Sequence, residues 1–113
     1  MGAVVFKQGN PEYVDYTPTS AVAADTVIVT GDTPRVCNRI LAANVLGAIA
    51  ARGGVYQCTG DAAIAADKKV YWVAATAKVS ESANSGGNKA FGVTVSLCSA
   101  DNATCMVRHD PGA

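Results

Sequence analysis

The chain has 113 residues, with nine Lys and Arg balanced by nine Asp and Glu. A chain of this length supports one domain, which buries roughly two-thirds of the surface that its unfolded form exposes. The absence of a basic cluster excludes the electrostatic surface of a nucleic-acid-binding protein. The longest uncharged run in the apolar middle of the sequence, residues 40–51, is far shorter than the roughly 20 residues that span a membrane. We therefore expect neither a nucleic acid nor a membrane as a partner.

Small, β-branched side chains dominate the apolar part of the composition. Hydrophobic residues make up 50% of the chain and aromatic residues only 6%, and there are 15 Val, 9 Thr and 4 Ile against 3 Leu. β-branched residues favour strands because they fit the pleated, half-buried surface of a sheet. The composition therefore predicts a β-rich protein.

The N-terminal part differs in kind from the rest. The run VVFKQGNPEYVDYTP alternates apolar and polar residues, and Pro11 and Pro18 oppose a place in the centre of a sheet. Such a segment can add a strand to another protein's sheet through backbone hydrogen bonds, or it can be an edge strand of its own domain. We therefore divide the chain into an extended N-terminal arm or edge strand, residues 1–18, and a single β-rich domain, residues 19–113.

Turn-forming residues punctuate the chain at the spacing of short strands. We expect strands at residues 4–7, 26–30, 35–40, 48–58, 69–74, 78–82, 90–97 and 105–109. In KKVYWVA, Val70 and Trp72 occupy one face and Tyr71 the other. In AFGVTVSLC, we expect the residues at positions 91, 93, 95 and 97 to share one face, and Gly92 to mark a bulge or a close backbone approach.

Two stretches have weaker patterns. In DAAIAADKK, Asp61 is a helix-capping residue followed by Ala, which predicts one helical turn. Residues 41–52 contain helix-forming Ala and Leu, but Asn44 and Gly47 interrupt them. We expect a loop followed by a strand there.

The sequence offers few groups for catalysis. The single histidine, His109, lies beside Asp110 near the C-terminus, where a lone histidine is usually a surface residue. Neither Glu12 nor Glu81 lies in an apolar run that would raise the pKa of its carboxyl group. No hydrolase, metalloprotease or phosphate-loop motif is found. We therefore predict no enzymatic activity, no catalytic residues, no metal and no cofactor.

The four cysteines leave two alternatives open. No C-x-x-C pair is present, which disfavours a zinc ribbon or a thioredoxin-type site. In CSADNATC, Cys98 and Cys105 flank a polar loop between two expected strands, a geometry that can bring them within disulfide range. Alternatively, Cys37, Cys58 and this pair are buried thiols that act as small hydrophobic residues, since nothing in the sequence indicates an oxidising compartment.

Several segments together resemble a known family. They are, in chain order, VFKQGNPEYVDYTPTSAVAADTVIVTGD, GGVYQCTGDAAIAADKKVYWVAATAKVSES, NKAFGVTVSL and VRHD. Their order and spacing resemble the capsid cement, or decoration, proteins of tailed bacteriophages. The four cysteines exceed the family pattern, so the resemblance assigns them no role.

The resemblance implies an all-β fold, namely a small β-barrel-like or β-tulip domain with an extended N-terminal arm and at most one short helix. It implies a structural virion protein on the outer surface of the capsid, a homotrimer at three-fold and quasi-three-fold positions that stabilises the expanded shell. The major capsid protein and the chain itself would be its partners. It would be made in the cytoplasm of the host bacterium, and the N-terminus shows no signal peptide.

By the same resemblance, the N-terminal arm would pair with the major capsid protein. Its contact residues would be Val4, Val5, Phe6, Tyr13, Val14 and Tyr16. We expect Tyr71 and Trp72 to act as oligomer or core anchors.

Two other classes of function compete with this one. A carbohydrate- or host-surface-binding module would be favoured by an exposed aromatic platform of Tyr56, Tyr71 and Trp72, and opposed by their burial. A small enzyme or redox protein would need a reactive, accessible cysteine that works with His109.

Overall fold

The computed structural model describes residues 4–112, and this part of the chain is all-β. Ten strands form a six-stranded antiparallel sheet, in the order β1-β6-β10-β9-β7-β8, and a four-stranded sheet, in the order β2-β5-β4-β3. The strands are β1 Val5–Gln8, β2 Glu12–Tyr16, β3 Thr26–Thr30, β4 Thr33–Cys37, β5 Gly47–Arg52, β6 Val55–Thr59, β7 Lys69–Val73, β8 Lys78–Ser80, β9 Lys89–Thr94 and β10 Thr104–His109. A single 3-10 turn, Asn84–Gly86, accompanies them. The predicted all-β fold with at most one short helix is therefore confirmed for the described residues. None of these residues forms a helix that is long and apolar enough to cross a membrane.

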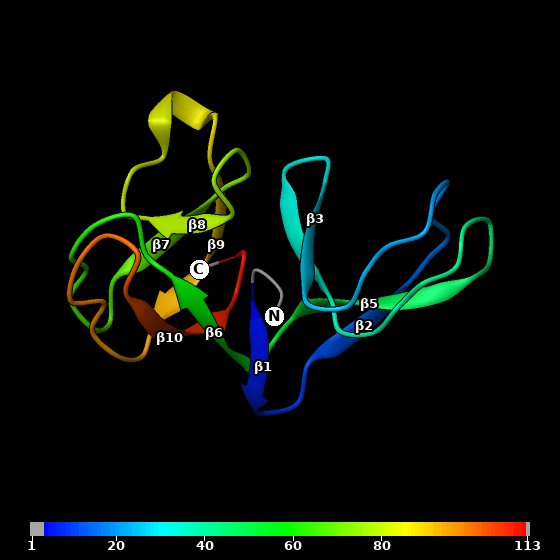
Figure 1. Cartoon of the computed structure of the whole chain (residues 1–113), viewed down its shortest axis with the longest axis horizontal. Coiled ribbons are helices and arrows are strands. Elements are labelled where there is room, and N and C mark those ends of the chain that lie inside the picture. Colours follow the sequence, from blue (N-terminus) through cyan, green and yellow to red (C-terminus); the bar gives the residue numbers. More distant parts are fainter. Residues whose placement is uncertain (1–3, 113) are drawn as a thin grey trace.

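The six-stranded sheet closes into a small barrel, which we call the barrel lobe (Figure 1). A parallel bridge joins Gly60, at the end of β6, to Val79 in β8, and the Asp61 amide donates a hydrogen bond of 3.0 Å to the Val79 carbonyl. Strands β6, β10, β9, β7 and β8 thus form a ring, and β1 is an extra strand on the outer edge of β6. The barrel encloses the larger core cluster, which includes Tyr56, Trp72 and Phe91.

Strand β9 carries the bulge that the sequence predicted at Gly92. Val70 pairs with Gly92 but Tyr71 pairs with Ala90, so Phe91 is an extra residue in β9. A Cβ atom at Gly92 would collide with the Arg108 carbonyl in β10, so only glycine fits there.

The bulge shifts the alternation of side chains along the rest of β9. Thr94 is buried, whereas Val95 and Leu97 are exposed. The expected shared face of residues 91, 93, 95 and 97 is therefore wrong for Phe91, which is buried, whereas Val95 and Leu97, which follow β9, are both exposed.

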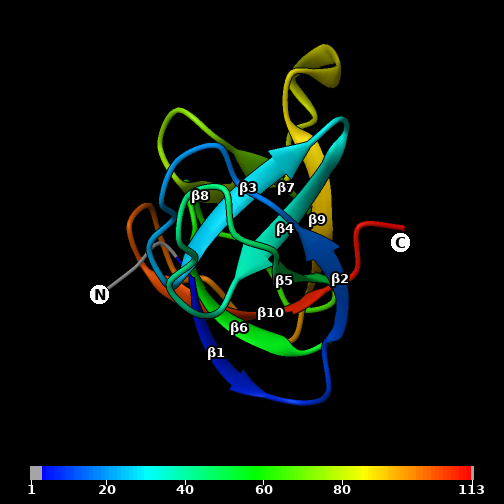
Figure 2. The same cartoon turned by 90° about the vertical axis from the view of Figure 1, so that its right-hand side faces the viewer.

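The four-stranded sheet, together with the loops 17–25 and 38–46, forms a second lobe that we call the sheet lobe (Figure 2). One face of this sheet contributes Val36 and Ala50 to the larger core cluster, so the two lobes share one core. The other face carries a smaller cluster, in which Leu41 from the loop covers Cys37 and Ile49.

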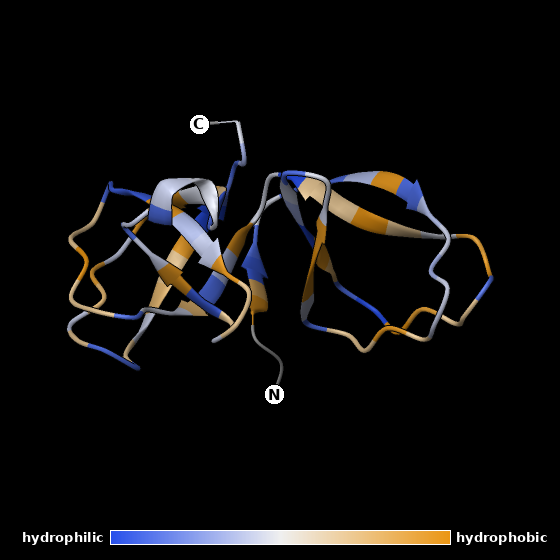
Figure 3. Cartoon of the chain, turned by 90° about the horizontal axis from the view of Figure 1, so that it is seen from above, coloured by the Kyte–Doolittle hydropathy of each residue, from blue (hydrophilic) through white to orange (hydrophobic). Residues whose placement is uncertain are grey.

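Two turns connect the lobes, which lie side by side when the molecule is seen from above (Figure 3). One connects β1 to β2, and the other, at Gly53 and Gly54, connects β5 to β6. Both glycines have positive φ, 86° and 82°, and a Cβ at Gly53 would lie 3.0 Å from the Asn10 carbonyl oxygen. The chain therefore reverses here, which corrects the expected single strand at residues 48–58 to β5 and β6.

The predicted helical turn at residues 61–69 is wrong. Ile64 and Cys98 exchange two backbone hydrogen bonds of 2.9 Å, and the Lys68 amide donates to Thr94 Oγ1 at 2.9 Å. Thr94 Oγ1 also donates to the Ala65 carbonyl at 2.8 Å. Long-range partners thus take the backbone groups that a helix would use. The expected loop followed by a strand at residues 41–52 is confirmed by β5.

Candidate functional site

The N-terminal segment lies in the domain as the edge strands of both sheets. Strand β1 pairs with β6 and strand β2 pairs with β5, each antiparallel and each at the end of its sheet. Of the two alternatives that the sequence left open, the described residues take the edge strand. Residues 1–3 of the expected arm lie outside the described part of the chain.

The six expected contact residues of this segment differ in exposure. Phe6, Tyr13 and Val14 are exposed, and Tyr16 packs against the smaller core cluster. Val4 is fully buried in the larger cluster, so its expected partner contact is corrected to a core position. The sixth residue, Val5, is half-buried.

A polar junction holds the exposed aromatic residues in place. Asn38 Nδ2 donates hydrogen bonds to the Tyr13 hydroxyl at 3.2 Å and to the Tyr56 hydroxyl at 3.0 Å. The Phe6 ring packs edge-on against Tyr56, with 5.5 Å between ring centres. Burial raises the pKa of Tyr56 to about 12, so this hydroxyl stays neutral at physiological pH. The edge surface of β1 and β2 is thus fixed by contacts to both lobes.

His109 is fully buried between the two lobes, which corrects its expected place on the surface. Its Nε2–H donates to the Pro34 carbonyl of β4 at 2.8 Å, and its ring centre lies 4.8 Å from that of Phe91. Nδ1 is buried and has no hydrogen-bond partner. Burial lowers the pKa of His109, so the ring is neutral. Because the ring is fully buried and bonded to Pro34 of the other lobe, it serves as a structural link between the lobes.

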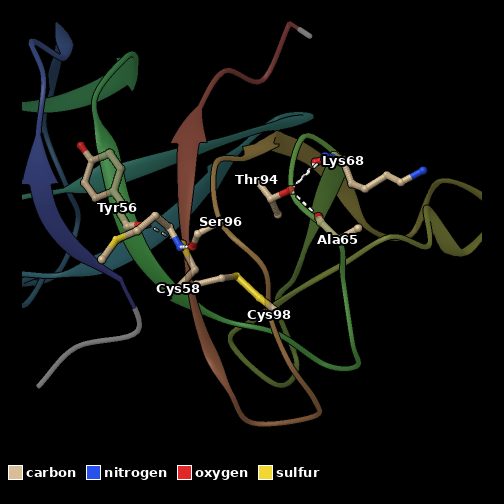
Figure 4. Close-up of a disulfide and its surroundings, with 9 residues drawn as sticks. Tyr56, Cys58, Ala65, Lys68, Thr94, Ser96 and Cys98 are labelled. Carbon is tan, nitrogen blue, oxygen red and sulfur yellow. Dashed lines mark hydrogen bonds between the residues drawn. A yellow bond between two sulfur atoms is a disulfide. The ribbon is translucent and has the colours of Figure 1, made fainter.

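The four cysteines divide into one pair and two single thiols. A disulfide joins Cys98 and Cys105, whose Cα atoms are 4.9 Å apart, and Figure 4 shows it beside Cys58. Cys37 and Cys58 are free and buried, and burial raises the pKa of both thiols. A buried, protonated thiol is a poor nucleophile, so neither thiol fits a redox or nucleophilic site. Within residues 4–112, no three His, Cys, Asp or Glu side chains come together to hold a metal ion.

Trp72 and Tyr71 occupy opposite faces of β7, as their alternation predicts. Trp72 is buried and packs against Phe91 with 5.6 Å between ring centres, so it anchors the core and is not available to an oligomer. Tyr71 is half-buried beneath Lys69, whose Nζ lies 5.6 Å from the ring centre. Because Tyr56 and Trp72 are both buried, these residues form no exposed aromatic platform for a carbohydrate.

A shallow, open hollow of about 330 Å³ adjoins β2 on the outer face of the sheet lobe. Val14 and Asp15 of β2 form one side of it, and Arg35 and Ile49 line it from the neighbouring strands. Besides one carboxylate and one guanidinium group, the hydroxyl-bearing residues Tyr16 and Thr30 line the hollow, and its lining includes no histidine or cysteine.

Sequence reasoning missed an apolar surface at the far end of the sheet lobe. Ile40, Val45 and Leu46 project there from the loop 38–46, and all three are strongly exposed. We call these three residues the apolar tip. The sequence does contain a signal for them, the uncharged run of residues 40–51, but we considered that run only as a candidate membrane span.

The geometry therefore presents exposed edges and apolar surface rather than a reaction centre. Comparison with protein families shows a match to the family described as phage cement protein, over residues 7–109. The comparisons with curated proteins and with solved structures give no match. The family match spans both sheets and nearly all of the described strands. The chain belongs to the phage cement protein family, which indicates a structural role in association with the phage capsid.

Proposed function

We propose that the protein binds the outer surface of a phage capsid as a homotrimer at three-fold and quasi-three-fold positions, and that it stabilises the expanded shell. The family match over residues 7–109 is the observation that carries this proposal. Membership in a structural family also supports a role without catalysis. The protein would be made in the cytoplasm of the host bacterium and would act on the virion.

The edge strands supply the capsid-binding surface in this proposal. Strand β2 has one sheet neighbour, β5, so its other side offers unpaired backbone groups to a strand of the major capsid protein. Tyr13 and Val14 are exposed on β2, and Phe6 is exposed on β1. The hollow beside Val14 can receive a side chain of the added strand.

Stabilisation of the shell follows from mass action. A protein that binds the expanded shell, and not its dissociated subunits, shifts the equilibrium toward the assembled form. Each copy needs to contribute only a few kcal/mol, because a capsid carries many copies.

Co-sedimentation with expanded, undecorated phage heads tests the proposal, with a matched pair of variants. Val14 on β2 and Val29 on β3 are each 37% exposed, on opposite edge strands of one sheet. We expect Val14→Asp to weaken head binding by roughly tenfold or more, because the new carboxylate must lose its water in the interface. We expect Val29→Asp to bind as the wild type does.

The readout is the saturation ratio, the affinity and the temperature at which the heads break. Saturable binding with a higher disruption temperature supports the proposal, and absence of binding by the wild type contradicts it. Equal loss in both variants contradicts the assignment to β2. Deletion of the N-terminal segment is a poor test, because it removes Val4 from the core and an edge strand from each sheet.

A further inference from the structure

The loop between β4 and β5, which carries the apolar tip, extends to the right-hand end of the molecule in Figure 1. Ile40 is 76% exposed, Val45 56% and Leu46 67%. Side chains of this size and exposure, gathered on one loop, are typical of a surface that a partner covers.

Backbone contacts between two loops fix this end of the sheet lobe. Val22 and Leu41 exchange two backbone hydrogen bonds of 2.9 Å, and the Asn44 amide donates to the Pro18 carbonyl at 2.7 Å. The Leu41 side chain is buried beneath. The tip is therefore held in a set conformation, so binding there costs little ordering of the chain.

The same contacts place two uncharged runs side by side. Residues 16–24 contain no charged side chain, and neither do residues 40–51. The charged groups that border these runs in the sequence are Asp15, Asp25, Arg39 and Arg52. The other exposed apolar pair, Val95 and Leu97, lies in the barrel lobe, where Val95 shares a hollow with Lys7.

We infer that the apolar tip is the surface through which copies of this chain contact one another. Groups that lie on a symmetry axis meet the same groups of the other copies, so a charged side chain on the axis repels its own equivalents. A surface without charges avoids this repulsion. An interface with a different protein could pair charged side chains of opposite sign, but the apolar tip has no charged side chain for such a pair. This assignment rests on the proposed function, because the homotrimer is part of that proposal.

An axis through the apolar tips leaves the edge strands accessible. The exposed residues of β1 and β2 belong to the sheet edges, whereas the tip belongs to the loop after β4. One copy can therefore contact its neighbours and the capsid at the same time through different residues.

Sedimentation velocity of the full chain, from low micromolar to hundreds of micromolar, tests the inference. We expect the wild type to associate, and Leu46→Asp to weaken association by roughly tenfold or more. Ile40→Asp is the second variant at the tip. Leu97→Asp is the matched control, because Leu97 is 60% exposed and lies in the other lobe. Circular dichroism establishes that each variant is folded.

Weaker association in both tip variants, with the control unchanged, supports the inference. A wild type that stays monomeric at all concentrations overturns it. The inference is also overturned if Leu46→Asp associates as strongly as the wild type, or if Leu97→Asp weakens association as much as the tip variants do. Head co-sedimentation separates this result from the proposed function. A monomer that still binds heads leaves the capsid role standing, whereas a chain that associates but binds no heads removes the capsid role and leaves the tip assignment intact.

Discussion

The two lobes use their apolar residues in opposite ways. The larger core cluster has thirteen buried residues, among them Tyr56, Trp72 and Phe91 of the barrel lobe. The smaller cluster on the outer face of the sheet lobe has only three, Cys37, Leu41 and Ile49. The barrel lobe therefore provides most of the burial that stabilises the fold.

Exposure shows the reverse distribution. Of the nine large apolar residues exposed in the described part of the chain, six belong to the sheet lobe: Tyr13, Val14, Val29, Ile40, Val45 and Leu46. A domain that keeps apolar groups exposed on one lobe and buries them in the other separates binding from folding. We therefore interpret the barrel lobe as the main scaffold and propose that the sheet lobe, together with the edge strand β1, meets the partners.

Matched core truncations give the largest expected contrast between the lobes. Phe91→Ala removes a ring that packs against Trp72 and His109, and we expect it to cost about 3–5 kcal/mol of unfolding free energy. Ile49→Ala opens a smaller cavity in the smaller cluster, where loops can relax, and we expect about 2 kcal/mol. Urea denaturation measures both.

The opposite result is equally clear to recognise. If Ile49→Ala lowers the free energy of unfolding as much as Phe91→Ala does, the sheet lobe is as important to the fold as the barrel lobe. If Phe91→Ala does not fold, Phe91→Leu provides a milder comparison at the same position.

The disulfide sharpens the comparison, because it lies in the barrel lobe alone. By the loop-entropy relation, the short loop between Cys98 and Cys105 corresponds to about 2.5 kcal/mol. We expect a reductant to lower the stability of the wild type by that amount and to leave a Cys98→Ala/Cys105→Ala variant unchanged. Cys37→Ala, in the sheet lobe, is the control that keeps the response to reductant.

Equal stability of the wild type with and without reductant would show that the pair is reduced in solution. All four cysteines would then be buried thiols, the alternative that the sequence also allowed.

The sequence predicts most strands because their patterns are local. The alternation of Val70 and Trp72 with Tyr71 places β7 correctly, and β3 has its expected bounds. Gly92 also indicates its bulge, because only a close backbone approach explains a glycine within that strand. Each of these features depends on neighbours in the sequence.

The missed features depend on residues that are distant in the sequence. Asp61 and the alanines after it favour a helix, but the partners of that loop are Cys98 and Thr94. His109 resembles a surface residue until β10 and β4 bring it against Pro34. The apolar tip, likewise, is recognised only when the loops 17–25 and 38–46 lie together.

The smallest expected effect concerns His109 at the junction of the lobes. Its pKa is lowered in the folded protein, first by burial, so the unfolded chain takes up a proton at a higher pH than the folded chain does. The contribution of His109 to the free energy of unfolding is therefore fully present above the ordinary histidine pKa. It is lost as the pH falls below that value toward the lowered pKa of the folded chain. From about pH 7 to about pH 5.5 the loss is at most about 1.3 kcal/mol, given an unfolded pKa of about 6.5.

Urea titrations across this range test the effect, and His109→Gln is the control because His109 is the single histidine of the sequence. The variant is less stable at every pH, since it loses the packing against Phe91. Its free energy of unfolding, however, lacks the decrease with falling pH that the histidine causes. The other titratable groups are the same in both proteins, so they contribute equally to the pH dependence of both. An equal slope in both proteins would show that His109 takes up its proton as readily in the folded chain as in the unfolded one. In that case the junction between the lobes admits water, and the scaffold and the binding lobe are less firmly joined than their shared core indicates.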